Sequence, residues 1–346
     1  MEQKRIELLR KLTEARGISG REDEVAEILR AELAGHADTV ERDAIKNLFV
    51  LKGMNKPGPR VMLNAHMDEV GLYVTHITKE GYLHVGKAGG IDDRLLLGKK
   101  VLVGTAPLPG VIAAKAVHLC TPEEIETKVV KVEDLVIDVG AKSDKDVAGK
   151  VAVGDQVTFA TTFGTFGDGY FVGKAFDDRA GCAVVAELLR IDWPFPVIGM
   201  FSTQEEIGTK GARVGAWRYT PDISITVEGT IAADIGEVKD YQEVTNLGGG
   251  PVLTIKDGGM VTDHQLRKRL IEIAAKNGLP WQFKRMPAGG TDARSIQTAK
   301  GGVKAVAVAV PARYIHSPVS LIKESDYENT VTLLTKFLAD LAGMEA

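Results

Sequence analysis

The sequence has little cysteine and no long apolar run. Cys120 and Cys182 are its only cysteines, and neither belongs to a Cys-x-x-Cys pair, so we expect a reducing compartment and no disulfide scaffold. The apolar run from Ala305 to Ala312 is interrupted by Pro311 and is far shorter than the roughly 20 residues of a membrane helix. Residues 1–10 lack the apolar core of a signal peptide. We therefore expect a cytoplasmic protein with no membrane partner.

An excess of positive charge is also missing. The chain has 43 Lys and Arg against 47 Asp and Glu, a formal net charge of -4, and no basic stripe, so a nucleic-acid partner is not expected. What the chain does have is length and apolar content. With 346 residues, 44% of them hydrophobic, the chain is longer than a single hydrophobic core usually accommodates, which predicts two domains.

The order of predicted elements is that of an α/β protein with an insertion. Apolar runs at 60–66, 197–201 and 223–227 predict buried strands, and the segments 179–190 and 263–277 predict helices. Such alternation predicts a mixed sheet covered by helices, formed by residues 1–69 and 164–346. Further strands are expected at 38–43, 47–52, 252–255, 281–285 and 304–310, and further helices near 6–12, 25–33, 211–217, 292–299 and 325–341.

Two helices carry the Ser-x-x-Glu spacing of a capping box at their expected start. The pairs are Ser19 with Glu22 and Ser325 with Glu328, and we expect each serine to cap the helix that follows it.

Residues 70–163 have a different character. Short β-type runs alternate with Gly, Pro and Asp turns, and a short helix near 122–127 is the exception. We interpret this segment as a small β-rich domain inserted into the α/β domain. Its expected strands are 73–77, 100–103, 110–114, 135–139 and 156–160.

Five apolar or extended runs end in side chains that bind metal ions in many proteins. They are His66 with Asp68, Asp177 with Asp178, Glu205 with Glu206, Glu228, and His316. Because ligands bind at the carboxyl ends of the strands in open α/β sheets, these ends are expected to meet. Histidine mixed with carboxylate suits zinc, cobalt or manganese better than calcium or magnesium. The number of carboxylates favours two metal ions with one bridging carboxylate.

Neighbouring positions suggest separate roles. Glu205 and Glu206 point to opposite sides of an extended segment, so one can bind a metal while the other moves protons. Asp68 lies two residues after His66 and is expected to accept its ring N–H, and Asp178 is expected to cap the next helix. Each residue taken singly also fits an ordinary structural or surface role, which leaves that alternative open at this point.

The same segments carry a resemblance to a known family. Residues 66–71, 176–181, 204–208, 289–293 and 313–318 resemble the motif series of the M42 metallopeptidases, in the family's order and over nearly the whole chain. The resemblance implies a zinc-peptidase-like catalytic domain, an inserted PDZ-like oligomerisation domain, and aminopeptidase action on short peptides. It also implies a homo-oligomer in which dimers assemble into a tetrahedral dodecamer.

The resemblance further implies roles for individual residues. Asp177 would bridge two divalent metal ions, zinc or cobalt before manganese, and would be joined to Asp178 by a cis peptide bond. Glu205 would be the general base and Asp68 would orient His66. The implied metal ligands are His66, Asp177 and Glu228 for one ion, and Asp177, Glu206 and His316 for the other.

Two positions depart from the family pattern, and two match it without an assigned role. Glu228 stands where many relatives have Asp, and Ser320 stands where Glu is common. Thr291 and Asp292 belong to a family motif but could equally form a structural loop.

Three other functions remain open at the sequence level. An M20-type metal-dependent carboxypeptidase or deacylase would not need a free N-terminus. An endoglucanase-type glycoside hydrolase would need carboxyl groups facing each other across a sugar, which the adjacent Glu205 and Glu206 do not supply. A non-catalytic scaffold would cleave no peptide.

Overall fold

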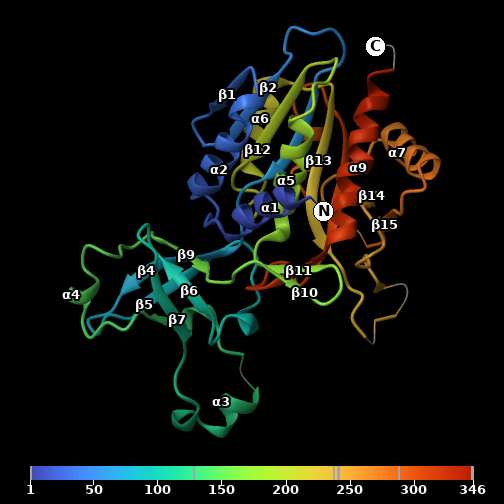
Figure 1. The fold of residues 1–346 in the computed structure, drawn as a ribbon. Coiled ribbons are helices and arrows are strands. Elements are labelled where there is room, and N and C mark those ends of the chain that lie inside the picture. The colour runs from blue at the N-terminus through green and yellow to red at the C-terminus, as the bar shows by residue number, and fades with distance from the viewer. Residues whose placement is uncertain (1, 128, 237, 240–241, 287–288, 344–346) are drawn as a thin grey trace.

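The computed structural model shows an α/β protein built on one large mixed sheet, as expected (Figure 1). It describes residues 2–127, 129–236, 238–239, 242–286 and 289–343. The helices of these residues are α1 (Gln3–Glu14), α2 (Asp23–Leu33), α3 (Pro122–Thr127), α4 (Asp144–Val147), α5 (Phe176–Leu189), α6 (Lys210–Tyr219), α7 (His264–Lys276), α8 (Ala293–Gln297) and α9 (Glu324–Leu341).

The strands fall into the large sheet and a separate barrel. Those of the sheet are β1 (Thr39–Arg42), β2 (Leu48–Lys52), β3 (Val61–His66), β10 (Gly164–Phe166), β11 (Tyr170–Gly173), β12 (Val197–Ser202), β13 (Ile223–Ile231), β14 (Val252–Thr254), β15 (Gln282–Lys284), β16 (Lys304–Arg313) and β17 (Ser320–Lys323). Those of the barrel are β4 (Gly71–Ile77), β5 (Leu83–Ala88), β6 (Lys100–Val103), β7 (Leu108–Ala113), β8 (Val136–Asp138) and β9 (Gln156–Phe159).

The centre of the large sheet is parallel. The strand order is β1-β2-β12-β3-β13-β16-β17-β11-β10, with β14 and β15 attached at β16, and the neighbours from β12 to β16 run in one direction. In this register Ser202 pairs with His66 and Thr226 pairs with Asn64. Glu228 therefore lies level with His66, and the strand ends meet at one edge of the sheet.

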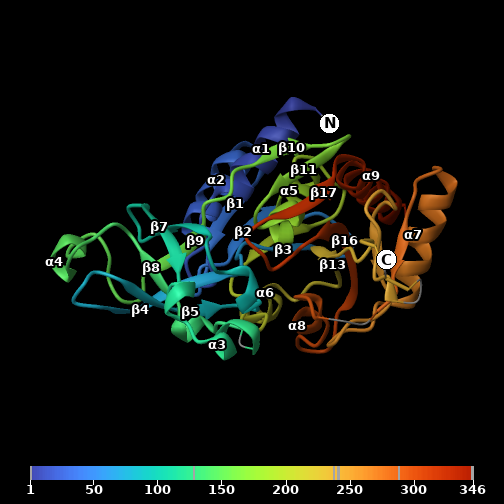
Figure 2. The ribbon, with the colours of Figure 1, turned by 90° about the horizontal axis from the view of Figure 1, so that it is seen from below.

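Helices cover both faces of this sheet. Because side chains alternate between the two faces along each strand, there is a hydrophobic core on each face. On β3, Val61 and Leu63 belong to the core under α5, while Met62 belongs to the core on the other face. Figure 2 shows α1 and α5 on one side of the sheet and α6 and α8 on the other. Each fully buried aliphatic side chain contributes roughly 1.5–3 kcal/mol to this packing.

The β-rich segment forms a closed six-stranded barrel with the order β4-β5-β8-β7-β6-β9. The barrel has a core of its own, which includes Leu72, Val74, Leu83, Ile112 and Ile137. The strand β5 was not predicted, because Gly and Lys after its first residues weaken the strand pattern. In Figure 1, α3 and its flanking segments project from the barrel, away from the large sheet.

Both predicted capping boxes are wrong, and the residues have other partners. The helix α2 begins at Asp23, the Ser19 hydroxyl donates to Asp68 at 2.6 Å, and Glu22 accepts main-chain N–H groups from the loops around it. Helix α9 begins at Glu324, so Ser325 lies inside its first turn. For Ser19 and Glu22, tertiary partners outcompete the local cap.

The hairpin of β10 and β11 was also missed. Its sequence contains several glycines, which lower strand propensity, but pairing of β11 with β17 holds it at the margin of the sheet. None of the described helices has the length and apolar character that a membrane crossing requires.

Candidate active site and metal centre

A pocket of about 400 Å³ opens at the carboxyl edge of the parallel strands. Six of the predicted site residues line it together, although they come from five separate segments of the chain. They are His66, Asp177, Glu205, Glu206, Glu228 and His316.

Asp177 lies between the two histidines. Its Oδ1 is 3.4 Å from Nε2 of His66, and its Oδ2 is 3.4 Å from Nε2 of His316. Nε2 of His66 is also 3.5 Å from Oε2 of Glu228, and Nε2 of His316 is 3.3 Å from Oε1 of Glu206. Each oxygen of Asp177 thus lies beside a different histidine, and each histidine is paired with a different glutamate.

Both imidazole rings are fixed through Nδ1. Nδ1 of His66 lies 3.0 Å from the main-chain oxygen of Asp68, and Nδ1 of His316 lies 3.0 Å from that of Gly90. Because a main-chain carbonyl only accepts, each Nδ1 carries the proton, and each Nε2 faces the carboxylates. The sequence had assigned the His66 N–H to the carboxylate of Asp68, but Oδ1 of that group is farther away, at 3.5 Å.

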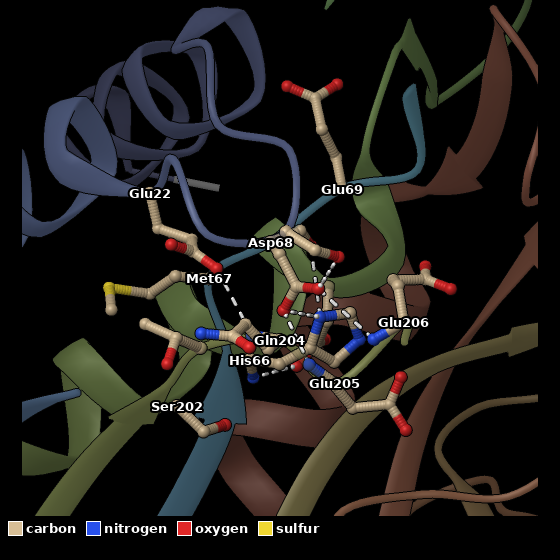
Figure 3. Close-up of polar contacts among 12 residues, drawn as sticks. Glu22, His66, Met67, Asp68, Glu69, Ser202, Gln204, Glu205 and Glu206 are labelled. Carbon is tan, nitrogen blue, oxygen red and sulfur yellow. Dashed lines mark hydrogen bonds and ion pairs between the residues drawn. The ribbon is translucent and has the colours of Figure 1, made fainter. Parts of the chain in front are cut away.

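The carboxylate of Asp68 instead holds the turn after β12. Its Oδ1 accepts the N–H of Glu205 at 2.9 Å, and its Oδ2 accepts the N–H of Glu206 at 3.1 Å and the hydroxyl of Ser19. Figure 3 shows the side chains of Glu205 and Glu206 leaving this turn in different directions. A single buried carboxylate therefore orients the main chain that presents both glutamates.

Glu22 supports the same turn from the loop before α2. Its Oε1 accepts the N–H of Gly20 at 2.6 Å and the N–H of Gln204 at 3.1 Å. Gln204 has a positive φ of 58°, which non-glycine residues rarely adopt. The hydrogen bond from Gln204 to Glu22 helps to hold that conformation. Figure 3 shows Glu22 and Asp68 approaching the turn from neighbouring segments.

Asp178 has a structural role as well as a place near the histidine. The backbone of Asp177 and Asp178 is not helical, so the regular part of α5 begins after them. Asp178 caps that part, as predicted, because its Oδ1 accepts the N–H of Gly181 at 3.0 Å, and the bond between Asp177 and Asp178 is cis. Its Oδ2 accepts the main-chain N–H of His66 at 3.1 Å. The main chain of Asp177 can come close to β13 because residue 229 is glycine: a Cβ there would lie 2.8 Å from Cα of Asp177.

Burial and crowding shift the ionisation of the site. Burial raises the pKa of Glu205 to about 10 and that of Glu206 to about 8. Burial alone would raise the pKa of Asp177 and lower those of His66 and His316. The attraction between these groups outweighs burial, so the pKa of Asp177 falls, that of His66 rises well above 6.5, and that of His316 rises to about 9.

These residues fit bound cations. Within the described residues, two groups place ligand atoms within 4.8 Å of one another: His66 with Asp178 and Glu228, and Asp177 with Glu206 and His316. Oε1 of Glu206 is buried and accepts no hydrogen bond; it faces Nε2 of His316 at 3.3 Å. Its charge is therefore balanced only when that histidine is protonated or a cation is bound. Cations at the Nε2 atoms would relieve the crowding of carboxylates and replace the protons that the histidines otherwise need.

Several residues near the site were not assigned a role from the sequence. The main-chain N–H of Asp292 donates to Oε1 of Glu228 at 3.3 Å, and the hydroxyl of Thr291, which lines the pocket, donates to Asp257 at 3.1 Å. Ser320 is buried, and its hydroxyl donates to the main-chain oxygen of Gly173. Lys284 lines the pocket too. No local pattern marks a lysine in a short strand as a pocket residue.

Comparison with known proteins places the chain among peptidases. The family model described as M42 glutamyl aminopeptidase matches residues 46–333. The putative aminopeptidase FrvX of Escherichia coli strain K12 is 35% identical over 342 residues, which cover 97% of this chain and 95% of that protein.

Solved structures agree with this placement. The TET aminopeptidase of the marine sediment archaeon Thaumarchaeota archaeon SCGC AB-539-E09 has a TM-score of 0.92 at 34% identity and covers 98% of this chain and 99% of its own. The TET1 peptidase of Pyrococcus horikoshii, which can assemble into a tetrahedron or a large octahedral shell, has a TM-score of 0.84 at 36% identity over 96% of this chain and 98% of its own.

With these likenesses, the α/β sheet and the pocket at its carboxyl edge define an enzyme that hydrolyses peptides. The chain belongs to the M42 family of peptidases.

Proposed function

We propose that this chain is a dinuclear metal aminopeptidase that removes the N-terminal residue from short peptides. The observation that carries the proposal is the position of Asp177, whose two oxygens lie 3.4 Å from Nε2 of two different histidines. His66, Asp177 and Glu228 would hold one divalent ion, and Asp177, Glu206 and His316 the other. Asp178 is left out because both its oxygens already accept main-chain N–H groups.

Glu205 is the proposed general base. It lines the pocket beside the ligands but forms no ion pair with either histidine in the described structure. Two bound ions would supply Lewis-acid activation of a water molecule and of the scissile carbonyl. Glu205 accepts a proton from the attacking water and gives it to the nitrogen of the leaving peptide. Positive charge nearby would lower the pKa of Glu205 from about 10 toward the range of a working base.

The first test separates proton transfer from metal binding. Glu205→Gln removes the base and keeps the shape of the side chain, so we expect kcat to fall by about 10²–10⁴-fold while metal content stays unchanged. Metal analysis and hydrolysis of aminoacyl anilides, with zinc, cobalt and manganese added separately, measure both. Near-normal turnover of this variant would exclude the assigned role.

Variants of the proposed metal ligands should instead lower the metal content. His316→Ala and Glu206→Ala should each lose one of two metal ions per subunit, because they belong to the same proposed site. Binding of metal to the native protein near pH 7 should release protons, since the pKa values of both histidines are raised. A metal content unaffected by His316→Ala would rule out the second site.

Blocking the substrate distinguishes the aminopeptidase from its rivals. An N-acetylated peptide should resist hydrolysis, whereas an M20-type carboxypeptidase or deacylase would accept it. A glycoside hydrolase would keep its activity in the presence of a chelator.

The domain division and the assembly belong to the same proposal. Residues 1–69 and 164–346 would form the catalytic domain, and residues 70–163 a PDZ-like oligomerisation domain. The closed barrel with its separate core supports a distinct unit, and the shells formed by the Pyrococcus horikoshii relative support a homo-oligomer. An interior location of the active sites would restrict substrates to short peptides.

A further inference from the structure

A second cavity adjoins the active pocket along helix α6. It has a volume of about 410 Å³ and is lined by residues of α6, of α8 and the two residues after it, and by Gly259. Arg294 lines both cavities, and the hydroxyl of Thr209 in the active pocket lies 2.6 Å from that of Ser295 in the second cavity. Figure 2 shows α6 and α8 next to each other. The two cavities are therefore neighbours that meet at Arg294.

The second cavity is positively charged. Among the described residues that line it, the two charged ones are arginines, Arg213 and Arg294, and both are exposed. Nε of Arg294 donates to the hydroxyl of Thr209 at 3.3 Å. Neither arginine forms an ion pair with a carboxylate in the part of the chain that the structure describes. Nζ of Lys300 adds a third charge 5.7 Å from the ring centroid of Trp217, which also lines the cavity.

The side chain of Arg294 is held by close packing. A Cβ at residue 259 would lie 2.6 Å from Cδ of Arg294, and a Cβ at residue 290 would lie 3.4 Å from its Nη1. Because both positions are glycine, the main chain can run directly against this side chain. An arginine that is already held in place loses less freedom when it binds an anion.

The neighbouring voids indicate where the leaving part of a peptide can go. On the side of the barrel, a void that shares Asp177, Glu206 and His316 with the active pocket measures about 10 Å³, which is room for one water molecule at most. The cavity beyond Arg294 is as large as the active pocket itself. A peptide bound with its first residue in the active pocket therefore has space to extend past Arg294.

The spacing along α6 determines which peptides can reach its arginine. Arg213 lies one helical turn beyond Thr209, which lines the active pocket, a rise of about 6 Å. Each residue of an extended peptide spans about 3.3–3.6 Å. Two or three residues after the cleaved bond are enough to carry a terminal carboxylate to Arg213, whereas the carboxylate of a dipeptide ends inside the active pocket.

We propose that Arg213 and Arg294 bind the C-terminal carboxylate of tripeptide and tetrapeptide substrates. This inference rests on the aminopeptidase function proposed above. The carboxylate balances the charge of one arginine from each of two helices. The ring of Trp217, which is 57% exposed, offers an apolar surface to the last side chain of the peptide. Such a subsite favours short peptides by their charge, independently of any limit on size that an assembly imposes.

The test compares a tripeptide with its C-terminal amide on the metal-loaded native enzyme. The substrates are X-Gly-Gly and X-Gly-Gly amide, where X is the residue whose anilide is hydrolysed fastest. We expect kcat/KM to favour the free acid by about 5- to 50-fold, between the effects of an exposed ion pair and of a buried charged hydrogen bond. The difference should lie in KM, because the carboxylate is bound equally before and during the reaction. It should shrink at 1 M salt.

The preference should also depend on the length of the peptide. The tetrapeptide of the same series should show it, because its terminus still reaches the two arginines. The dipeptide X-Gly and an octapeptide should not, since the terminus of the first stops short of the arginines and that of the second passes beyond them. Each peptide is compared with its own amide, so the N-terminal residue and the cleaved bond stay the same.

Variants show whether the two arginines cause the preference. Arg213→Gln and Arg294→Gln should each bring the ratio of acid to amide hydrolysis toward one. Arg213→Glu should make the amide the better substrate, an inversion that misfolding cannot produce. Arg218→Gln is the matched control, because Arg218 is an exposed arginine of the same helix that pairs with Glu41 outside the cavity, and it should keep the native ratio. Metal content is measured for each variant.

The outcomes separate this inference from the proposed function. If the native enzyme hydrolyses neither an anilide nor a peptide with any metal, the proposed function fails and this inference falls with it. If peptides are cleaved at a ratio near one, or if both Gln variants keep the native ratio, only this inference is wrong. A preference of equal size at every length would show a general attraction of carboxylates by the metal centre, which also overturns the proposal.

Discussion

Glu22 and Asp68 determine where the two pocket glutamates lie, although neither lines the pocket. Oε2 of Glu22 is buried without a hydrogen-bond partner. Burial, followed by the charge of Asp68, raises the pKa of Glu22 to about 7. An ionised Glu22 is therefore unfavourable in the folded protein. Its effect on the free energy of unfolding must depend on pH.

This cost can be measured with Glu22→Gln, which resembles the protonated form. Between pH 4.5 and 7 the unfolded chain ionises Glu22 while the folded protein keeps the proton, so native stability falls as pH rises. The loss is complete above pH 7 and amounts to about 3 kcal/mol. The stability gained by Glu22→Gln should grow over this range and then stay constant.

Urea midpoints of both proteins in the presence of a chelator, measured from pH 4.5 to 8, check this prediction. Glu27→Gln, which removes an exposed carboxyl group of α2, the helix that follows Glu22, controls for the loss of one negative charge. A difference between native protein and Glu22→Gln that does not change with pH would contradict the raised pKa.

Among the secondary-structure elements, the junction of α1, β3 and α5 depends on one buried arginine. Arg179, which is fully buried, donates to the main-chain oxygens of Leu12, Ala15, Gly17 and Met67. It shares Glu69 with Lys174. Arg179 therefore closes the end of α1 and fixes the segments that carry His66 and Asp177.

Removal of this side chain should be costly. Arg179→Ala leaves several buried carbonyl groups and part of the charge of Glu69 without donors, which should destabilise the fold by about 3–5 kcal/mol and weaken metal binding. Arg179→Lys keeps the charge but not the planar fork and should recover part of the loss. Denaturation midpoints and metal content measure the two effects.

The exposed Arg30 of α2, paired with Glu27, provides the control. Arg30→Ala should leave the midpoint nearly unchanged, because exposed ion pairs contribute little. Equal effects at both positions would show that the buried network is not what holds the junction.

The elements also show what a sequence can predict. His66, Glu205 and Glu228 could be found because each ends a recognisable apolar run, and a parallel sheet brings such ends together. The partners of Ser19 and Glu22 could not be found in this way. Their local spacing fits a cap, but Ser19 donates to Asp68 and Glu22 accepts from Gln204, both far along the chain. Lys284 was missed for the same reason, since only the packing of β15 directs it into the pocket.

At the scale of the whole molecule, the segment 115–127 around α3 is the feature that the fold does not explain. It projects from the barrel (Figure 1) and exposes three large apolar side chains: Val117 (72%), Leu119 (62%) and Ile125 (54%). A projecting apolar segment is unfavourable in water and is typical of a surface that another subunit covers. It is the part of the proposed oligomerisation domain best suited to contact a second copy.

The double variant Val117→Ser with Leu119→Ser tests this role. Burial of each side chain is worth roughly 1.5–3 kcal/mol, so replacement at every interface should convert the assembly to smaller particles, measured by light scattering. Metal content and hydrolysis of a short anilide should persist, because the segment supplies no pocket residue. Val153→Ser, at an equally exposed apolar position of the barrel region (64%), is the control. If the assembly of the double variant keeps the native mass, another surface must join the subunits. If the variant loses metal as well as assembly mass, the projecting segment supports the catalytic domain directly.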